Sequence, residues 1–219
     1  MTLVTLSAPY GAGGSAIGPR LAKRLGVPFL DRAIPTAVAD RLAVPLEQAL
    51  DRDECASGLL ARLLAGFAPA AQAVGGAPPP IDALDDREYL EATEHVIRER
   101  AASGDGVFLG RAAAIVLRDE PHALHVRLDG PVEARLEQAM RIEGVDRRTA
   151  ERQQAETDRA RDAYVRQFYR CDSRDARHYH LVIDSTAIDL DTCVDLIAQA
   201  ARAHMGARAV ASVEGGGAA

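Results

Sequence analysis

Cysteine, lysine and long apolar runs are scarce in this chain of 219 residues, and each shortage excludes a class of protein. Its 3 cysteines, Cys55, Cys171 and Cys193, lie far apart and form no C-x-x-C pair. This argues against a disulfide framework or a zinc site and fits a reducing compartment. No apolar run approaches the roughly 20 residues of a membrane span, and no signal peptide precedes the first expected strand. We therefore expect a cytoplasmic protein that does not enter a membrane.

The chain also lacks an excess of positive charge. Its formal net charge is −6 at pH 7, and Lys23 is the only lysine among its 26 basic residues. Binding to a nucleic-acid backbone needs a basic face, so we expect no nucleic-acid partner. We attribute the preference for arginine, together with the heavy use of alanine, to coding bias rather than to chemistry.

Five short apolar runs predict buried parallel strands. They cover residues 3–6, 28–30, 107–109, 123–128 and 181–183. Helical patterns at residues 87–101, 131–142 and 146–169 separate most of them, and a further one at residues 189–205 follows the last run. This alternation predicts an α/β fold in which helices cover both faces of a five-stranded parallel sheet. We expect one domain over residues 1–205, followed by a disordered tail over residues 206–219.

The segment after the first strand has the pattern of a phosphate-binding loop without its basic residue. A short strand, a glycine turn and a helix together aim backbone N–H groups at an anion. The standard loop reads G-x-x-x-x-G-K-[ST], and here the position of its lysine falls on Gly14 or Ser15. A tight turn that binds no ligand is the alternative. Nucleotide binding and phosphoryl transfer are therefore separate questions for this chain.

The helix after the glycine turn contains a proline. Ile17, Leu21 and Leu25 are spaced by four and predict a stripe that faces the core. Pro19 removes one helical hydrogen bond and clashes with the preceding turn. We expect this helix either to start late, near Gly18, or to kink.

Charged residues follow the second and third strands. Because the carboxyl ends of parallel strands meet at one edge of a sheet, Asp31, Arg32, Gly110 and Arg111 should lie near the glycine turn. Asp31 could hold Mg²⁺ through water or orient an acceptor hydroxyl, or it could cap a helix or form a surface ion pair. Arg111 could bind a phosphate or carboxylate through both arms of its guanidinium, or pair with a carboxylate such as Asp129.

The segment between Gly144 and Arg159 has no large apolar residue after Val145. A helix of this composition cannot pack deeply, so residues 144–162 predict an exposed and mobile lid. The charged cluster at residues 158–162 is either a solvated face with i,i+4 pairs or a source of cations for a migrating phosphoryl group.

Two further motifs favour structural roles. His178 and His180 precede the fifth strand, and we do not expect them to form a metal site. Tyr164, Phe168 and Tyr169 lie on a predicted core stripe rather than on a platform for stacking bases.

Taken in order, these segments resemble the cytidylate kinase-like family of P-loop nucleoside monophosphate kinases. The matching runs are VTLSAPYGAGGSAIGPRLAKRLGVPFLDR, GVFLGRAAAIVLRD, ALHVRLDGPVEARLEQAMRIEG, ETDRARDAYVRQFY and YHLVIDS. The resemblance implies a P-loop kinase fold with a helical acceptor-binding region over residues 33–102 and an arginine-bearing lid over residues 144–162. It also implies phosphoryl transfer from ATP, with Mg²⁺, to CMP or dCMP.

The resemblance assigns roles to individual residues. The donor phosphates would be bound by Gly11, Ala12, Gly13, Gly14, Ser15 and Ala16. The acceptor would be bound by Asp31, Arg32, Gly110 and Arg111. Arg159 and Arg161 match the lid arginines that clamp the transferring phosphoryl group, and Asp31 joins them as a catalytic candidate. No protein residue is assigned to a metal ion.

The chain departs from the family pattern at the loop and beside the acceptor motif. Cytidylate kinases have a lysine after the second loop glycine and a threonine soon after, where this chain has Gly14, Ser15 and Ala16. Kinase-like relatives often place arginine at position 15. Ala112 replaces an aspartate that helps to read cytosine. The chain is therefore either a nucleoside monophosphate kinase or, alternatively, a non-catalytic nucleotide-binding regulatory protein.

Overall fold

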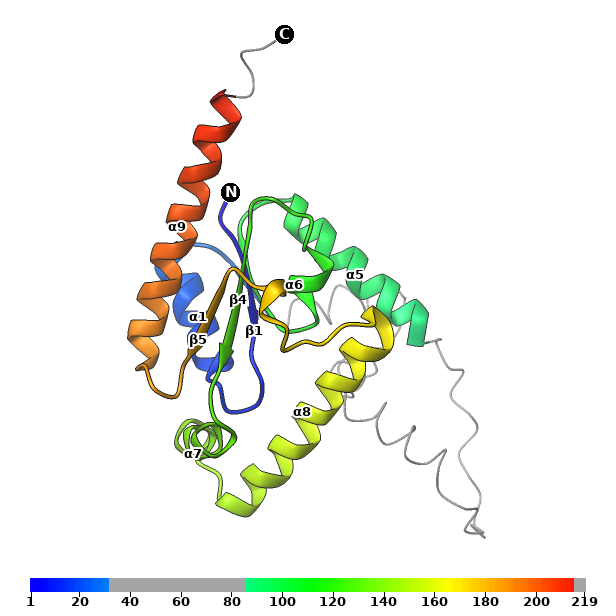
Figure 1. Ribbon diagram of the computed structural model, residues 1–219, viewed down its shortest axis with the longest axis vertical. Helices are drawn as coiled ribbons and strands as arrows, with labels where there is room; N and C mark the ends of the chain where they lie inside the picture. Colours follow the sequence, from blue (N-terminus) through cyan, green and yellow to red (C-terminus); the bar gives the residue numbers. More distant parts are fainter. Residues whose placement is uncertain (32–85, 215–219) are drawn as a thin grey trace.

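A five-stranded sheet forms the centre of the molecule. The computed structural model describes residues 1–31 and 86–214, and the sequence prediction of an α/β fold with a five-stranded parallel sheet is confirmed (Figure 1). The strands are β1 (Leu3–Ser7), β2 (Phe29–Leu30), β3 (Gly106–Leu109), β4 (Ala123–Asp129) and β5 (Leu181–Asp184). Their order in the sheet is β2-β3-β1-β4-β5, and all neighbours are parallel.

The first strand lies at the centre of the sheet. Leu6 pairs in register with Leu109 on one side and with Val126 on the other. Parallel strands end at the same edge, so the segment after β1 emerges between the ends of β3 and β4. The register therefore places the glycine turn at the middle of the carboxyl edge.

Helices cover both faces of the sheet. One face packs against α1 (Gly14–Leu25) and α9 (Leu190–Glu214), and the other against α5 (Asp86–Ala102) and the short α6 (Ala113–Val116) (Figure 1). Near the carboxyl edge lie α7 (Val132–Glu143), α8 (Arg147–Tyr169) and a 3₁₀ turn, η1 (Ala176–His178). Within residues 1–31 and 86–214, no helix is both long and apolar enough to cross a membrane.

The start of α1 corrects one expectation. The helix begins at Gly14, and Pro19 lies inside it, so the predicted late start near Gly18 is wrong. Gly13, in the left-handed conformation with φ of 75°, breaks the preceding turn and lets the helix begin at once. Pro19 lies beyond the first turn of the helix, so the hydrogen bond that a backbone N–H at this position would donate to the carbonyl of Ser15 is lost inside the helix.

The end of α9 corrects a second expectation. The helix continues to Glu214, so the boundary predicted after Met205 falls inside it. The added segment is rich in alanine, a strong helix former, and its one glycine, Gly206, costs only about 1 kcal/mol of helix propensity. Residues 215–219 of the predicted tail, and residues 33–85 of the predicted acceptor-binding region, lie outside the described ranges.

Three histidine rings lie next to one another beside the amino end of β4. The rings of His125 and His180 are 5.0 Å apart and nearly parallel, and His204 on α9 lies 5.1 Å from His180. His125 is 4% exposed, and its Nδ1 lies 2.8 Å from Oγ1 of Thr5. Burial, with a smaller effect of His180, lowers the pKa of His125 from 6.5 to about 4.

We predict that this histidine makes the fold sensitive to acid. The pKa of His125 is lower in the folded protein than in the unfolded chain, so its stabilising effect is complete above pH 6.5 and is lost as pH falls towards 4. The loss should be on the order of 3 kcal/mol of unfolding free energy. Urea unfolding across this pH range should show a shallower decline for His125→Gln than for the wild type. The exposed His122→Gln should keep the wild-type decline, and equal slopes in all three proteins would contradict the assignment.

Candidate functional site

The loop between β1 and α1, residues 8–13, has the backbone conformation of an anion-binding turn. Gly11 and Gly13 adopt left-handed conformations, with φ of 77° and 75°. A Cβ atom on Gly11 would lie 2.1 Å from the backbone oxygen of Arg135, so no larger residue fits there. Among the residues that the structure describes, the backbone N–H groups of Gly11, Gly13, Gly14 and Ser15 have no acceptor. Such N–H groups at the start of a helix can bind an anion.

Side chains from three other segments bind the carbonyl groups of this loop. The donors are Arg161 to Ala8 (2.6 Å), Arg135 to Tyr10 (2.5 Å), Gln138 to Gly11 (3.0 Å) and Ser185 to Ala12 (2.8 Å). These contacts fix the loop from its carbonyl side and leave the N–H groups for a ligand. Our sequence reasoning did not find Arg135, Gln138 or Ser185. The i,i+3 spacing of Arg135 and Gln138 on α7 was the one available signal.

The position of the missing lysine is closed by packing. A Cβ atom on Gly14 would lie 2.8 Å from Cβ of Ala8 and 3.0 Å from Cδ1 of Leu109. Ala8 stands where the standard loop has its first glycine. The methyl group of Ala8 thus takes space that a side chain at position 14 would need, and the two departures from the motif are complementary.

Two of the three acceptor-side residues that the structure describes, Asp31 and Arg111, pair with each other. Nη1 of Arg111 lies 2.9 Å from Oδ1 of Asp31 and also donates to the carbonyl of Leu109 at 3.2 Å. The suggested pairing of Arg111 with Asp129 is therefore wrong, because Asp129 accepts from Arg127 at the end of β4. The surface ion pair was one of the alternatives for Asp31, which is 36% exposed.

The backbone that carries Arg111 is unusual. Gly110, Arg111 and Ala112 all have positive φ, at 72°, 51° and 52°. Non-glycine residues adopt this left-handed conformation at some cost, and such residues cluster at ligand sites. The turn places Arg111 beside Asp31 and makes Ala112 the N-cap of α6. Arg32 lies outside the described residues.

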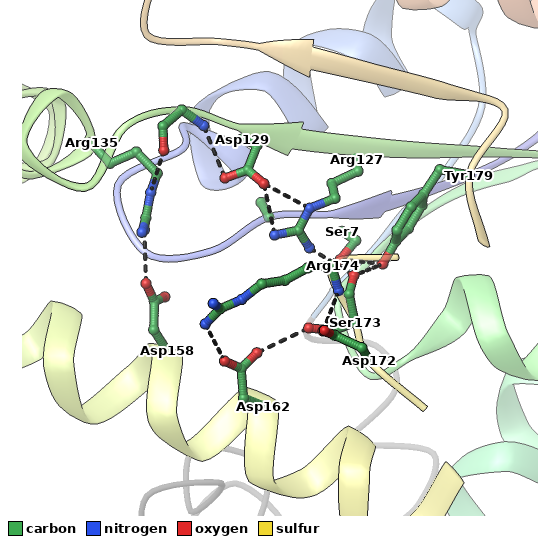
Figure 2. A network of polar contacts seen from close by, with 12 residues as sticks. Ser7, Arg127, Asp129, Arg135, Asp158, Asp162, Asp172, Ser173, Arg174 and Tyr179 are labelled. Atoms are coloured by element: carbon green, nitrogen blue, oxygen red, sulfur yellow. Dashed lines mark hydrogen bonds and ion pairs between the residues drawn. The ribbon is translucent and has the colours of Figure 1, made fainter. Parts of the chain in front are cut away.

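The aspartates of the charged cluster on α8 bind other groups of the protein. Oδ1 of Asp158 accepts from the backbone N–H of Tyr10 at 2.8 Å, and Oδ2 accepts from Arg135 at 2.9 Å. Asp162 accepts from Ser173 at 3.0 Å and pairs with Arg174 (Figure 2). The interpretation of this cluster as a solvated face is therefore wrong for both aspartates.

The two arginines of the cluster occupy different surroundings. Arg161 donates to the glycine loop, whereas Arg159 has no hydrogen bond or ion pair among the described residues and lines a hollow beside Arg166. Arg161 is accessible to solvent although protein atoms surround its guanidinium, and this partial desolvation lowers its pKa. The charges of Asp158 and Asp31 oppose that shift. Arg161 therefore interacts with groups at both the loop and the acceptor side.

The helix α8 is joined to the loop through polar contacts and small residues. The hydroxyl of Tyr10 lies 2.6 Å from Glu143 and 2.7 Å from Gln153, and burial and Glu143 raise the pKa of this tyrosine. Gln154 donates to the carbonyl of Val132, and Ala150 is buried. These polar contacts and this small buried residue agree with the shallow packing that the composition of residues 144–162 predicts. The mobility of the lid stays a prediction, and opening it would break the contacts of Asp158 and Arg161.

Known proteins resemble this chain in sequence and in fold. The model of the cytidylate kinase-like family matches residues 3–187. The chain belongs to the cytidylate kinase-like family. A crystal structure of an uncharacterized protein from Eubacterium ventriosum shares the fold, with a TM-score of 0.64 and 20% identity over 92% of this chain and 99% of that chain.

Other similar proteins are more distant from this member of the cytidylate kinase-like family. Shikimate kinase from Acinetobacter baumannii has a TM-score of 0.49 and 15% identity over 91% of this chain and 92% of its own. A gluconokinase from Sinorhizobium meliloti has a TM-score of 0.48 and 18% identity over 96% of each chain.

One curated relative is similar in sequence over a short stretch. Uronate isomerase from Corynebacterium glutamicum is 31% identical over 99 residues, which are 45% of this chain and 19% of that protein. The chain thus matches about a fifth of the length of that relative.

In this cytidylate kinase-like protein, one edge of the sheet brings together most of the predicted site. Asp31 and Arg111 form one ion pair there, and the glycine loop and Arg161 lie within contact of each other. The charges of Asp31 and Arg111 act on Arg161 in opposite directions, since Asp31 raises its pKa and Arg111 lowers it. The donor and acceptor roles of these residues stay predictions, whereas their convergence is a property of the fold.

Proposed function

We propose that this protein transfers a phosphoryl group from ATP to a nucleoside monophosphate, with CMP or dCMP as the first acceptors to test. The observation that supports the proposal most is the position of Arg161. Its guanidinium donates to Ala8 in the donor loop at 2.6 Å, and on the acceptor side the charge of Asp31 raises the pKa of Arg161 while that of Arg111 lowers it. A cation between donor and acceptor is what a migrating phosphoryl group requires.

Each part of the site has a role in this proposal. The N–H groups of Gly11, Gly13 and Gly14 would bind the donor phosphates, and the fork of Arg111 would bind the phosphate of the acceptor. An oxygen of that phosphate attacks the terminal phosphorus of ATP as the bond to the leaving ADP oxygen breaks. Arg161 would stabilise the charge on the three equatorial oxygens during this exchange.

The residues present fit a magnesium ion as well. Ser15, in the first turn of α1, occupies the serine or threonine position whose hydroxyl binds Mg²⁺ in the standard loop. Asp31 offers a carboxylate at the same edge of the sheet. Mg²⁺ is usually held by one or two such side chains together with phosphate oxygens and water. When bound, the ion neutralises charge on the donor phosphates.

A specific observation favours a second candidate, a nucleotide-binding protein without turnover. The packing of Ala8 and Leu109 against Gly14 leaves no room for the lysine that reaches the outer phosphates. The retained loop N–H groups could still bind a nucleotide, because backbone contacts do not depend on that lysine.

A coupled assay of ATP consumption with Mg²⁺ and a panel of nucleoside monophosphates tests the proposal. We expect turnover with at least one acceptor, and with CMP or dCMP before the purine nucleotides. Gly11→Ala should abolish it, because the added methyl would overlap the backbone of Arg135, and circular dichroism should show that this variant still folds. ATP or ADP binding with no transfer to any acceptor would leave the non-catalytic candidate.

A further inference from the structure

The glycine loop keeps the groups that bind two phosphates and lacks those that bind a third. In the standard loop the backbone N–H groups cradle the α- and β-phosphates, and the lysine reaches the β- and γ-phosphates. Here the N–H groups of Gly11, Gly13 and Gly14 have no acceptor among the described residues, and position 14 has no side chain. The loop therefore lacks only the side chain that would reach the outermost phosphate of a triphosphate.

A carboxylate binds the loop next to these N–H groups, on the side where the outermost phosphate would lie if the phosphate chain runs from the start of α1 towards Tyr10. The N–H of Tyr10, which precedes the free N–H groups along the loop, donates to Oδ1 of Asp158 at 2.8 Å. This oxygen takes the place that an anionic ligand oxygen would take on the same N–H group. A third phosphate extending from the start of α1 towards Tyr10 would approach a resident negative charge, and like charges repel.

Asp158 is held firmly in this position. Arg135 binds its second oxygen at 2.9 Å (Figure 2). Arg135 also donates to the carbonyl of Tyr10, so the two side chains together bind the N–H and the carbonyl of one loop residue. The side chain of Asp158 is 21% exposed and that of Arg135 is 7% exposed. A ligand that displaced the Asp158 side chain from the loop would break an ion pair that is largely shielded from water. It would also leave Arg135 without its carboxylate partner.

We propose that Asp158 makes the loop selective for a nucleoside diphosphate over a nucleoside triphosphate. The inference rests on the proposed nucleotide site and goes beyond it, because it assigns the length of the bound phosphate chain to one residue. Two phosphates fit the N–H groups between Gly11 and Ser15, whereas a third must displace the carboxylate from Tyr10. If the protein is a kinase, it would bind its product ADP more tightly than its substrate ATP. If it has no turnover, ADP would be the nucleotide that it binds preferentially.

The test is a comparison of dissociation constants for ADP and ATP by calorimetry. The wild type should bind ADP at least about tenfold more tightly than ATP, since one charged contact is worth about that factor. Asp158→Asn should reduce this preference to near unity or reverse it, chiefly by tightening ATP. Asp162→Asn, one helical turn away and bound to Ser173 and Arg174, should keep the wild-type ratio. Inorganic pyrophosphate and tripolyphosphate should repeat the pattern.

The outcomes separate this inference from the proposed function. Equal or tighter binding of ATP by the wild type, or an unchanged ratio in Asp158→Asn, overturns the selectivity even if the protein turns over. Selective ADP binding without any phosphoryl transfer supports the selectivity and removes the proposed kinase activity. If the wild type binds neither nucleotide, both are wrong. Hydrogen exchange at the amide of Tyr10 should be faster in Asp158→Asn, which checks that the contact exists in solution.

Discussion

Replacement of Arg161 by alanine should lower the maximal rate of phosphoryl transfer by about 10³-fold or more, with little change in the affinity for ATP. The loop carbonyls of Tyr10, Gly11 and Ala12 keep their own donors in this variant, so the nucleotide cradle should persist. What disappears is the cation between donor and acceptor, and the position of the absent lysine offers no substitute. Steady-state kinetics with varied ATP, beside calorimetric ATP binding, measures both quantities.

Three further arginine variants make this prediction specific. Arg111→Ala should mainly raise the KM of the acceptor, since Arg111 lies beside Asp31 rather than on the loop. Arg159→Ala should reduce the rate far less than Arg161→Ala, because no contact joins it to the loop within the described structure. The exposed Arg152→Ala on the same helix is the matched control. If Arg161→Ala and Arg159→Ala both retain the full rate, lid arginines do not replace the loop lysine.

Restoration of the loop lysine should succeed only when Ala8 is changed as well. Gly14→Lys alone forces its Cβ to 2.8 Å from that of Ala8, and such overpacking costs about 1–3 kcal/mol of stability. In Ala8→Gly/Gly14→Lys the methyl group is gone, and the new ammonium should tighten ATP binding by roughly tenfold to a hundredfold. Urea unfolding and calorimetry of the two single variants and the double variant form a complete double-mutant cycle.

The expected signature of this cycle is a strong coupling between positions 8 and 14. Ala8→Gly alone should change ATP binding little, since it adds no cation. Additive effects of the two substitutions, or an ATP affinity for Gly14→Lys equal to that of the double variant, would show that the packing at Gly14 is not what excludes the lysine.

The strands and the outline of the site could be predicted from the sequence because they depend on local signals. Short apolar runs between helical patterns can become buried strands in few ways, and the strand-turn-helix pattern placed the glycine loop at the carboxyl edge. The residues that follow strands, Asp31 and Arg111, were expected near the loop for the same topological reason. Helix ends were also predicted within a few residues, with two exceptions. Pro19 suggested a late start for α1, and the alanine-rich segment after Met205 extends α9 beyond its predicted end.

Only the tertiary structure determines which side chains bind which groups of the glycine loop. The contact between Tyr10 and Asp158 joins residues 148 apart, and that between Ala12 and Ser185 joins residues 173 apart. No local pattern specifies such partners, because the packing of whole helices brings them together, and side-chain geometry then selects the bond. The same holds for Ala8 and Gly14, whose separate departures from a motif became one compensating pair only when their Cβ positions could be compared. The sequence determined that an anion-binding loop exists, and the packing of α7 and α8 determined which charges stand around it.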